Sequence, residues 1–310
     1  MPAPRVALII NEHAGRGRIA RQIPVVANAL RAHDIEPTIL PTRGPLDAMR
    51  LARQAAEERF STVVAVGGDG TVNEVANGLM AGPGDRPSLG MVAAGSGCDF
   101  ARSFGLPKRF DGSLRGIVGP TVSIDVGRIE CQGPDGSIVR HFVNVAGAGM
   151  AAATAGLAAR LPRWVGRARY LLAFWPTLAS YRPTAITVAV AGEVHSGVAH
   201  NALVANGRYF GGGMLISPHS DPGDGLFDVQ VSIGPKRQAL TLIPRIYRGS
   251  HLPNRRIVQF EGDHVTIASD SPIPVEADGE PVGSTPATFT IVPGALDVVS
   301  ASSDACAHPR

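Results

Sequence analysis

Cysteine is scarce in this 310-residue chain, and the three that occur, Cys98, Cys131 and Cys306, are scattered without the spacing of metal ligands. An odd set of distant cysteines does not form a disulfide framework, so we expect free thiols in a reducing compartment. Long apolar runs are also missing, and none approaches the roughly 20 residues that a membrane-spanning helix needs. The start of the chain leads straight into a strand-like run without the apolar region of a signal peptide. These absences predict a cytoplasmic protein.

A strong charge of one sign is missing as well. The 29 Lys and Arg residues nearly balance the 26 Asp and Glu residues, which leaves a net charge of +3. This excess is too small to predict nucleic-acid binding, and no nucleic-acid-binding motif occurs. With 44% apolar and 18% charged residues, the chain is globular and long enough for two domains.

Several well-known enzyme signatures do not occur. The chain has no Gly-Lys-Ser/Thr of a P-loop, no protein-kinase catalytic loop, no His-Glu-x-x-His and no Gly-x-Ser-x-Gly. The dinucleotide fingerprint Gly-x-Gly-x-x-Gly also fails, because Ala20 follows Gly15-Arg16-Gly17 at the decisive position. The glycine-rich turns of this chain therefore serve something other than a standard dinucleotide site.

One stretch that is present organises the first half of the chain. The apolar run Val63–Val66 stops at Gly67-Gly68-Asp69-Gly70-Thr71, and a helix-competent segment follows to Leu79. This pattern predicts a strand, a tight turn and a helix. Glycines let the backbone approach a ligand, and the N–H groups that open a helix can receive phosphate. Asp69 could meet a cation on that phosphate, although an ordinary strand-to-helix turn explains the glycines too.

The same strand, loop and helix order occurs four times. Strands are expected at Val6–Ile10, Ile35–Leu40, Val63–Val66 and Leu89–Val92, with helices at about 19–32 and 46–58 after the first two. Successive units of this kind imply a parallel sheet that collects ligands at the carboxyl ends of its strands. We therefore expect the glycine loops to face one crevice.

From about Thr121 the pattern changes to short alternating segments, which predict antiparallel strands and a second domain. The expected strands are 122–129, 138–145, 186–190, 198–205, 227–233, 265–268, 273–275, 287–292 and 296–299. Two helical segments, 151–180 and 236–248, interrupt them. The first mixes arginines with tryptophan and other aromatic residues, so it could meet a membrane surface or pack on the sheet with a solvated basic edge.

Two turns in this second part carry carboxylates. Asp221, Asp224 and Asp228 lie within eight residues of one another, and such oxygen-rich turns can bind a hard cation. Asp278-Gly279-Glu280 places two carboxylates two residues apart, and one of them could accept a proton from an attacking hydroxyl. Both stretches are also ordinary turn sequences, since Asp and Gly are favoured turn residues.

Taken together and in this order, these stretches resemble the diacylglycerol kinase catalytic-domain family, which includes bacterial lipid kinases, sphingosine kinases and ceramide kinases. Gly67 to Val75 resembles its GGDGTxNEV motif, and Asn11 with Ala14 to Gly17 resembles NPxxGxG. Ser96 to Arg102 resembles GTxNDFAR, Gly211 to Asp228 resembles GGG…P…DG…D, and Asp278 to Glu280 matches DGE. Each match alone is weak, but five in the right order from residue 6 to about 283 are specific.

The resemblance implies an α/β fold with an N-terminal parallel-sheet nucleotide-binding domain, similar to 6-phosphofructokinase and NAD kinase, and a C-terminal β-sandwich. The expected limits are residues 1–122, with about 291–310 returning to the first domain, and 123–290 for the lipid-substrate domain. The activity implied is ATP-dependent phosphorylation of a lipid hydroxyl such as that of diacylglycerol, at a membrane surface that the protein contacts peripherally. We leave a homodimer open and, from the small net charge, expect no nucleic-acid partner.

Site residues follow from the resemblance by motif position. Asp278 would be the general base with Glu280 supporting it, and Asp69 would help to hold Mg²⁺ on the phosphates. A structural Mg²⁺ would lie on the Asp224 side chain and the Asp221 and Leu226 carbonyls. The residues implied for the nucleotide are Asn11, Glu12, His13, Ala14, Gly15, Thr42, Gly67, Gly68, Asp69, Gly70, Thr71, Val72, Asn73, Glu74 and Ser96.

Departures from the family pattern leave the lipid open. Glu12 replaces a proline, Ser96 a threonine, Cys98 an asparagine and Ala151 an aspartate. Ser96 keeps a hydroxyl, so nucleotide binding should survive, whereas Cys98 and Ala151 put the lipid preference in question. Two alternatives stay open: an NAD kinase-like phosphotransferase, which shares the GGDGT loop, and a non-catalytic lipid-binding or regulatory protein. The presence of Asp69, Asp278 and Glu280 together argues against the second.

Overall fold

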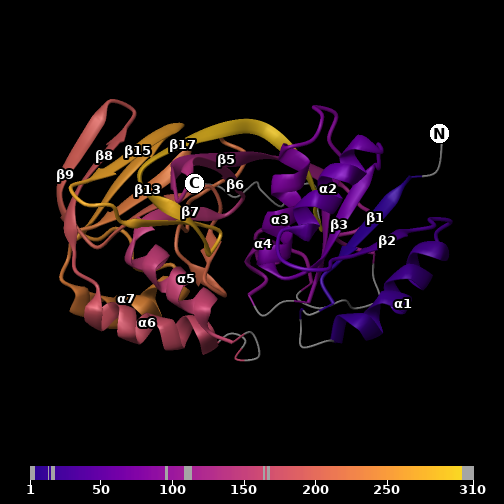
Figure 1. Ribbon diagram of the computed structural model, residues 1–310, viewed down its shortest axis with the longest axis horizontal. Helices are drawn as coiled ribbons and strands as arrows, with labels where there is room; N and C mark the ends of the chain where they lie inside the picture. The colour runs from indigo at the N-terminus through magenta and orange to yellow at the C-terminus, as the bar shows by residue number, and fades with distance from the viewer. Residues whose placement is uncertain are drawn as a thin grey trace. The chain divides into compact units, whose positions relative to one another are not determined.

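A computed structural model of the chain describes residues 4–12, 14, 18–94, 97–107, 114–162, 165 and 168–301. The chain divides into two compact units (Figure 1). Unit 1 consists of Met1–Ile124 with Gly294–Arg310, and unit 2 consists of Asp125–Pro293. The chain therefore leaves unit 1 once and returns to it at the end.

Unit 1 is built on a parallel sheet in the order β17-β4-β3-β1-β2. β1, β3 and β4 are buried almost throughout, as expected of parallel strands whose two faces are both covered. The end of β17 runs parallel to β4, where Val298 lies opposite Leu89. The first four strands are β1 Val6–Ile10, β2 Thr38–Pro41, β3 Thr62–Gly67 and β4 Ser88–Ala93.

In the described part of unit 1, four helices follow the strands. They are α1 Arg18–Arg31, α2 Asp47–Glu57, α3 Asp69–Met80 and α4 Asp99–Ser103. α2 and α3 pack closely at Gly78, where an added Cβ would lie 2.2 Å from the Met49 carbonyl oxygen. The predicted strand 35–40 begins only at Thr38, because the Ile35 amide donates to the Leu30 carbonyl in the turn that ends α1.

Unit 2 is mainly an antiparallel sheet. β14, β13, β10, β7, β16 and β17 follow one another, and β15, β8, β9, β5 and β6 join through β17. Only β5 and β17 contain residues of both units. The strands are β5 Thr121–Gly133, β6 Gly136–Phe142, β7 Val145–Gly149, β8 Thr184–Val190, β9 Glu193–Ala199, β10 Asn201–Ala205, β11 Tyr209–Phe210, β12 Met214–Leu215, β13 Phe227–Ser232, β14 Ile257–Gly262, β15 His264–Ser269, β16 Pro274–Ala277 and β17 Glu280–Val299.

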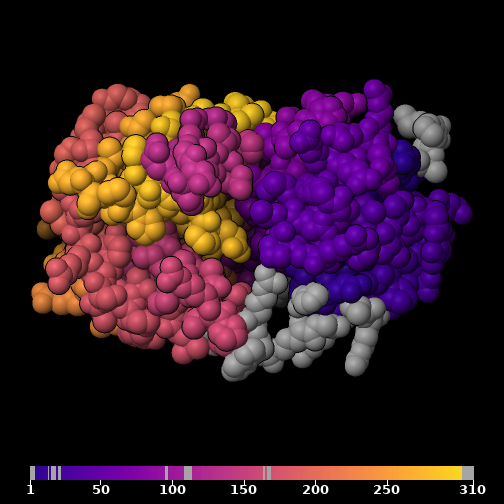
Figure 2. All heavy atoms as spheres, in the orientation of Figure 1, coloured from indigo at the N-terminus to yellow at the C-terminus, as the bar shows by residue number. Residues whose placement is uncertain are grey.

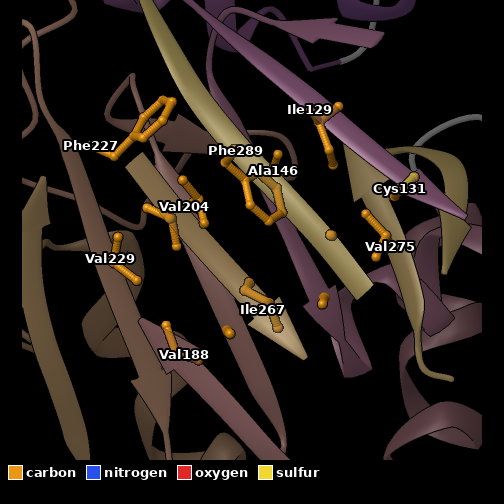
Figure 3. Close-up of a cluster of buried hydrophobic side chains, with 14 of the residues drawn as sticks. Ile129, Cys131, Ala146, Val188, Val204, Phe227, Val229, Ile267, Val275 and Phe289 are labelled. Atoms are coloured by element: carbon orange, nitrogen blue, oxygen red, sulfur yellow. The ribbon is translucent and has the colours of Figure 1, made fainter. Parts of the chain in front are cut away.

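The core of unit 2 is formed by alternate residues of these strands (Figure 3). Three aromatic side chains lie together in it, with the Phe142 ring stacked on Phe227 at 5.6 Å and edge-on to Phe289 at 6.3 Å. Gly127 faces the same ring, and an added Cβ there would lie 2.2 Å from it. The apolar alternation seen in the sequence thus builds this core, and a smaller second cluster of unit 2 contains Val145, Leu203, Ala205, Phe210 and Ile216.

The predicted strand 138–145 is wrong as a single strand, since β6 ends at Phe142 and β7 starts at Val145. The predicted helical segment 151–180 contains two helices, α5 Met150–Arg160 and α6 Ala168–Ser180. The segment 236–248 contains the 3-10 helix η3 Lys236–Gln238 and α7 Ala239–Tyr247. The last two predicted strands are parts of the single long strand β17.

Candidate functional site

The glycine turn of unit 1 lies between β3 and α3, as the sequence predicts. The amides of Thr71 and Val72 both donate to the Gly68 carbonyl, which closes the first turn of α3. An added Cβ at Gly67 would lie 2.4 Å from the Thr71 hydroxyl oxygen, so the turn accepts only glycine there without a shift. Asn11 joins this turn, because its side-chain amide donates to the Thr71 hydroxyl at 3.2 Å. The loops after β1 and β3 are therefore neighbours.

Asp69 is partly buried at the start of α3. Its carboxylate accepts the backbone amide of Phe100 at 3.1 Å, and the amides of Asp99 and Cys98 also lower its pKa. Burial is the larger effect and raises the pKa of Asp69 above its ordinary value. The carboxylate thus ties the glycine turn to the first turn of α4.

Glu74 forms a similar link on the other side of α3. One of its carboxylate oxygens accepts the Ala48 amide at 3.2 Å, in the first turn of α2. A carboxylate at the N-terminus of a helix is stabilised by the unpaired N–H groups of the helix and by the helix dipole. Thr42 lies beside β1, since its amide donates to the Ile10 carbonyl. The predicted nucleotide residues after the first three strands therefore converge at the carboxyl ends of these strands.

The remaining predicted nucleotide residues are less informative. Glu12 is exposed, and the Ala14 amide donates to the Asn11 carbonyl. Val72 is buried in the core, so only its backbone could face a ligand. His13, Gly15 and Ser96 lie outside the described residues.

In unit 2, Asp278 occupies the turn between β16 and β17. Its carboxylate accepts three backbone amides: those of Asn144 and Val145 on Oδ1 and that of Val143 on Oδ2, all within 3.1 Å. The Asp278 amide in turn donates to the Val145 carbonyl. Three N–H donors fix the orientation of the carboxylate. The same hydrogen bonds explain why β6 ends before β7 begins. Val143 and Asn144, which lie between the two strands, turn their amides towards Asp278.

Two residues that the sequence analysis did not identify hold the same turn. Glu276 is fully buried, and one of its carboxyl oxygens accepts the Gly279 amide at 2.7 Å. The Tyr170 hydroxyl donates to the Gly279 carbonyl at 2.5 Å. Glu276 could have been noticed as the only charged residue in the apolar run 273–277. Glu280, in contrast, is exposed at the start of β17.

The aspartate turn of unit 2 is closed by its own side chains. Asp221 accepts the Gly223 amide, and Asp224 accepts the Leu226 amide, each two residues ahead. Asp125, which the sequence analysis missed within a predicted strand, reaches this turn and accepts the Gly225 amide at 2.7 Å. The three predicted metal ligands thus lie on one ordered turn.

The chemistry of this turn suits a hard cation. Burial raises the pKa of Asp228 above its ordinary value, and the neighbouring carboxylates of Glu261 and Asp224 raise it further. The turn offers carboxylate and carbonyl oxygens, which are the ligands that Mg²⁺ prefers. In the described part of the chain, no three His, Cys, Asp or Glu side chains form a metal-binding group. A cation here would depend on the Asp221 and Leu226 carbonyls as well as on the Asp224 carboxylate.

The two units define the class of protein. A parallel sheet with a glycine turn and an antiparallel unit inserted before its last strand is the fold of NAD kinase-like proteins, which the predicted fold class named. The chain superposes on yeast NADH kinase with a TM-score of 0.55, at 13% identity over 98% of this chain and 86% of that one. A diacylglycerol kinase from Bacillus anthracis strain Sterne gives a TM-score of 0.74 at 24% identity, over 97% and 98% of the two chains. The predicted fold class is confirmed.

The chain belongs to the diacylglycerol kinase family of lipid kinases. Residues 5–129 match the diacylglycerol kinase catalytic domain, and residues 144–300 match the YegS C-terminal NAD kinase beta sandwich-like domain. The diacylglycerol kinase of Bacillus subtilis strain 168 is 30% identical over 295 residues, which cover 92% of each chain. That of Mycobacterium tuberculosis strain H37Rv is 31% identical over 301 residues, or 95% of this chain and 94% of the relative. The resemblance seen in the sequence is confirmed.

None of the helices in the described ranges is long and apolar enough to cross a membrane.

Proposed function

We propose that the protein transfers the γ-phosphoryl group of ATP to the hydroxyl of a lipid, with diacylglycerol the first candidate. Support comes from the family, whose relatives are named diacylglycerol kinases, and from the arrangement of each unit. The observation that carries the proposal is the turn that holds Asp278, in which the carboxylate is fixed by three backbone amides. A group fixed in this way is ready to bind a hydroxyl without rearrangement.

In unit 1, the loops around Asn11, Thr42 and Gly67–Glu74 would bind the nucleotide. Backbone amides at the start of a helix and glycines that allow a close approach suit the phosphates. Mg²⁺, when bound, would neutralise phosphate charge, and Asp69 lies at the start of α3 where such an ion would be held. The Asp69 and Glu74 carboxylates also join α3 to α4 and to α2 through backbone amides.

In unit 2, Asp278 would accept the proton of the lipid hydroxyl, with Glu280 beside it on β17. Three amide donors hold this carboxylate in one orientation, and phosphoryl transfer needs positioning and charge stabilisation more than a strong base. The aspartate turn would hold a structural Mg²⁺ through the Asp224 carboxylate and the Asp221 and Leu226 carbonyls. Its task would be to keep the loop before β13 in place.

The direct experiment is transfer of label from γ-labelled ATP with Mg²⁺ to a micellar panel of diacylglycerol, monoacylglycerol, sphingosine, ceramide and phosphatidylglycerol. We expect label in one of these lipids and a loss of at least a hundredfold in kcat for Asp278→Asn. Asp270→Asn is the matched control, because Asp270 is an exposed aspartate of the same unit. A panel that stays unlabelled, or full turnover by Asp278→Asn, would refute the proposal.

A further inference from the structure

Acidic residues are absent from two long segments of unit 2. Residues 136–192 and 229–260 hold twelve of the chain's 29 basic residues and none of its 26 acidic residues. The other 17 basic and 26 acidic residues leave the rest of the chain with a formal charge of −9, although the whole chain carries +3. The positive charge is therefore concentrated in the segments that contain α5, α6, η3 and α7.

The outer face of α6 carries no charged side chain. Leu171, Leu172 and Trp175 are 60%, 54% and 50% exposed, and Pro176 and Ala179 are exposed along the same stripe. Positions at this spacing share one face of a helix. A helix on the surface of a globular protein normally turns charged residues to water. Three large apolar side chains next to one another instead mark a surface that is covered in use.

The second helix of this surface, α7, has no buried residue at all, although its sequence is mostly apolar. Its exposed positions form two neighbouring stripes, one apolar and one polar and basic. The apolar stripe is Leu240, Pro244 and Tyr247, and the other is Thr241, Arg245 and Arg248. Apolar residues beside arginines, with no acidic residue between them, are typical of a helix that lies in a membrane interface.

The two helices are tied together where α6 ends. The Lys236 ammonium group, in η3 just before α7, donates to the carbonyls of Ala179 at 3.0 Å and Tyr181 at 2.7 Å. Figure 1 shows α5, α6 and α7 gathered along one edge of unit 2, and Figure 2 shows side chains of the α5 and α6 segment on the surface there. The apolar stripes of α6 and α7 therefore belong to one region of unit 2.

We propose that unit 2 docks on a bilayer of anionic phospholipid through this region, called here the α6–α7 face. The face consists of Leu171, Leu172, Trp175, Leu240 and Tyr247, with Arg237, Arg245 and Arg248 beside them. The apolar side chains would enter the headgroup boundary, where tryptophan and tyrosine are favoured. The arginines would attract the anionic lipids, each strengthening binding about fivefold. The docking proposal rests on the proposed lipid kinase activity, because docking would bring the protein to a lipid substrate in the membrane.

The test is sedimentation of the full-length protein with sucrose-loaded vesicles, without ATP. One set of vesicles contains phosphatidylcholine alone, and the other contains 30% phosphatidylglycerol. We expect the wild type to bind the anionic vesicles at least tenfold more tightly than the neutral ones. The double variant Leu171→Glu/Trp175→Glu should bind the anionic vesicles at least tenfold more weakly than the wild type does. The matched control is Val194→Glu/Val198→Glu, because these valines of β9 are 64% and 61% exposed but lie outside the two acid-free segments.

The charge contribution has its own pair of variants. Arg245→Gln/Arg248→Gln should weaken binding to anionic vesicles about 25-fold, from two losses of about fivefold each. Arg50→Gln/Arg53→Gln on α2 makes the same change in net charge in unit 1 and should leave binding within twofold. Equal effects of the two pairs would overturn the proposal, since net charge alone would then explain the attraction.

A third measurement does not depend on changing the face. The chain has two tryptophans, Trp164 and Trp175, so Trp164→Phe leaves Trp175 as the only one. The fluorescence emission of Trp175 should shift to the blue when anionic vesicles are added, because the side chain would enter an apolar environment. An unchanged emission would overturn the proposal, and so would a protein that self-associates through this face and does not bind vesicles.

Activity separates this proposal from the proposed function. With a short-chain diacylglycerol dispersed as single molecules, Leu171→Glu/Trp175→Glu should turn over within twofold of the wild type, and it should lose activity only on vesicles. Vesicle binding without phosphorylation of any lipid would refute the proposed kinase activity and support membrane docking through the α6–α7 face. Phosphorylation without selective binding to anionic vesicles would refute the docking proposal and support the kinase activity.

Discussion

Replacing Glu276 with glutamine probes how the turn that carries Asp278 is held. Glu276 is fully buried, and burial raises the pKa of its carboxyl group well above 4.5, with Asp278 and Glu280 raising it further and the Gly279 amide acting against them. Such a carboxyl group stays protonated over a pH range in which an exposed glutamate is charged. Glutamine has nearly the same shape and keeps an oxygen that can accept the Gly279 amide.

The sign of the effect follows from proton binding. Above pH 4.5 the unfolded chain releases the Glu276 proton and the folded chain keeps it, so the free energy of unfolding of the wild type falls as pH rises towards the raised pKa. The fall is at most about 1.4 kcal/mol for each pH unit. The variant has no proton to lose at this position, so its free energy of unfolding should rise relative to that of the wild type as the pH increases from 5 to 7.

Urea denaturation of both proteins at pH 5, 6 and 7, followed through the transition of unit 2, measures this difference. Glu193→Gln on β9 is the control, because it makes the same chemical change at an exposed position. Its free energy of unfolding should follow that of the wild type at every pH. Parallel pH profiles for Glu276→Gln and the wild type, or a variant that loses stability towards pH 7, would show that Glu276 is ionised in the folded protein and would refute the reasoning.

Three further substitutions test other contacts by the same denaturation assay. Gly67→Ala should lower the free energy of unfolding by about 1–3 kcal/mol, because the new methyl group meets the Thr71 side chain. Adding Thr71→Ala in the same chain should recover most of the loss. If nothing is recovered, the cost of Gly67→Ala does not come from contact with Thr71. Tyr170→Phe should cost about 1 kcal/mol through the hydrogen bond to the Gly279 carbonyl, and an unchanged midpoint would show that bond to be worth nothing. Phe142→Ala should cost about 3–5 kcal/mol, since the ring is fully buried among two others, and a loss below 1 kcal/mol would contradict that packing.

The parallel sheet could be predicted because its signals are local. Apolar runs that end in glycine turns recur in order, and β3 with the start of α3 lies where the sequence places it. The antiparallel part was harder, because β9 is an edge strand whose Val194 and Val198 face solvent, so its pattern does not look like that of a core strand. The break between β6 and β7 has no local signal at all. It arises from Asp278, which recruits the amides of that turn from more than 130 residues along the chain.

The site residues could be named from motifs, but their partners could not. Nothing near Glu74 in the sequence indicates that it meets the first turn of α2, and nothing near Asp69 indicates the start of α4. Tyr170 reaches the Gly279 carbonyl from a helix that the sequence analysis expected either to meet a membrane surface or to pack on the sheet. Such contacts depend on how segments pack, and packing is decided by the whole core.

Three carboxylates that bind backbone amides affect how the activity of this protein's relatives can be judged from their sequences. Asp69, Glu74 and Asp278 each bind backbone amides of another segment, so each contributes to folding whatever it does in turnover. Selection for a stable fold alone would keep them in a descendant that had lost its activity. The presence of Asp69 and Asp278 is therefore weaker evidence of a working enzyme than the sequence analysis took it to be.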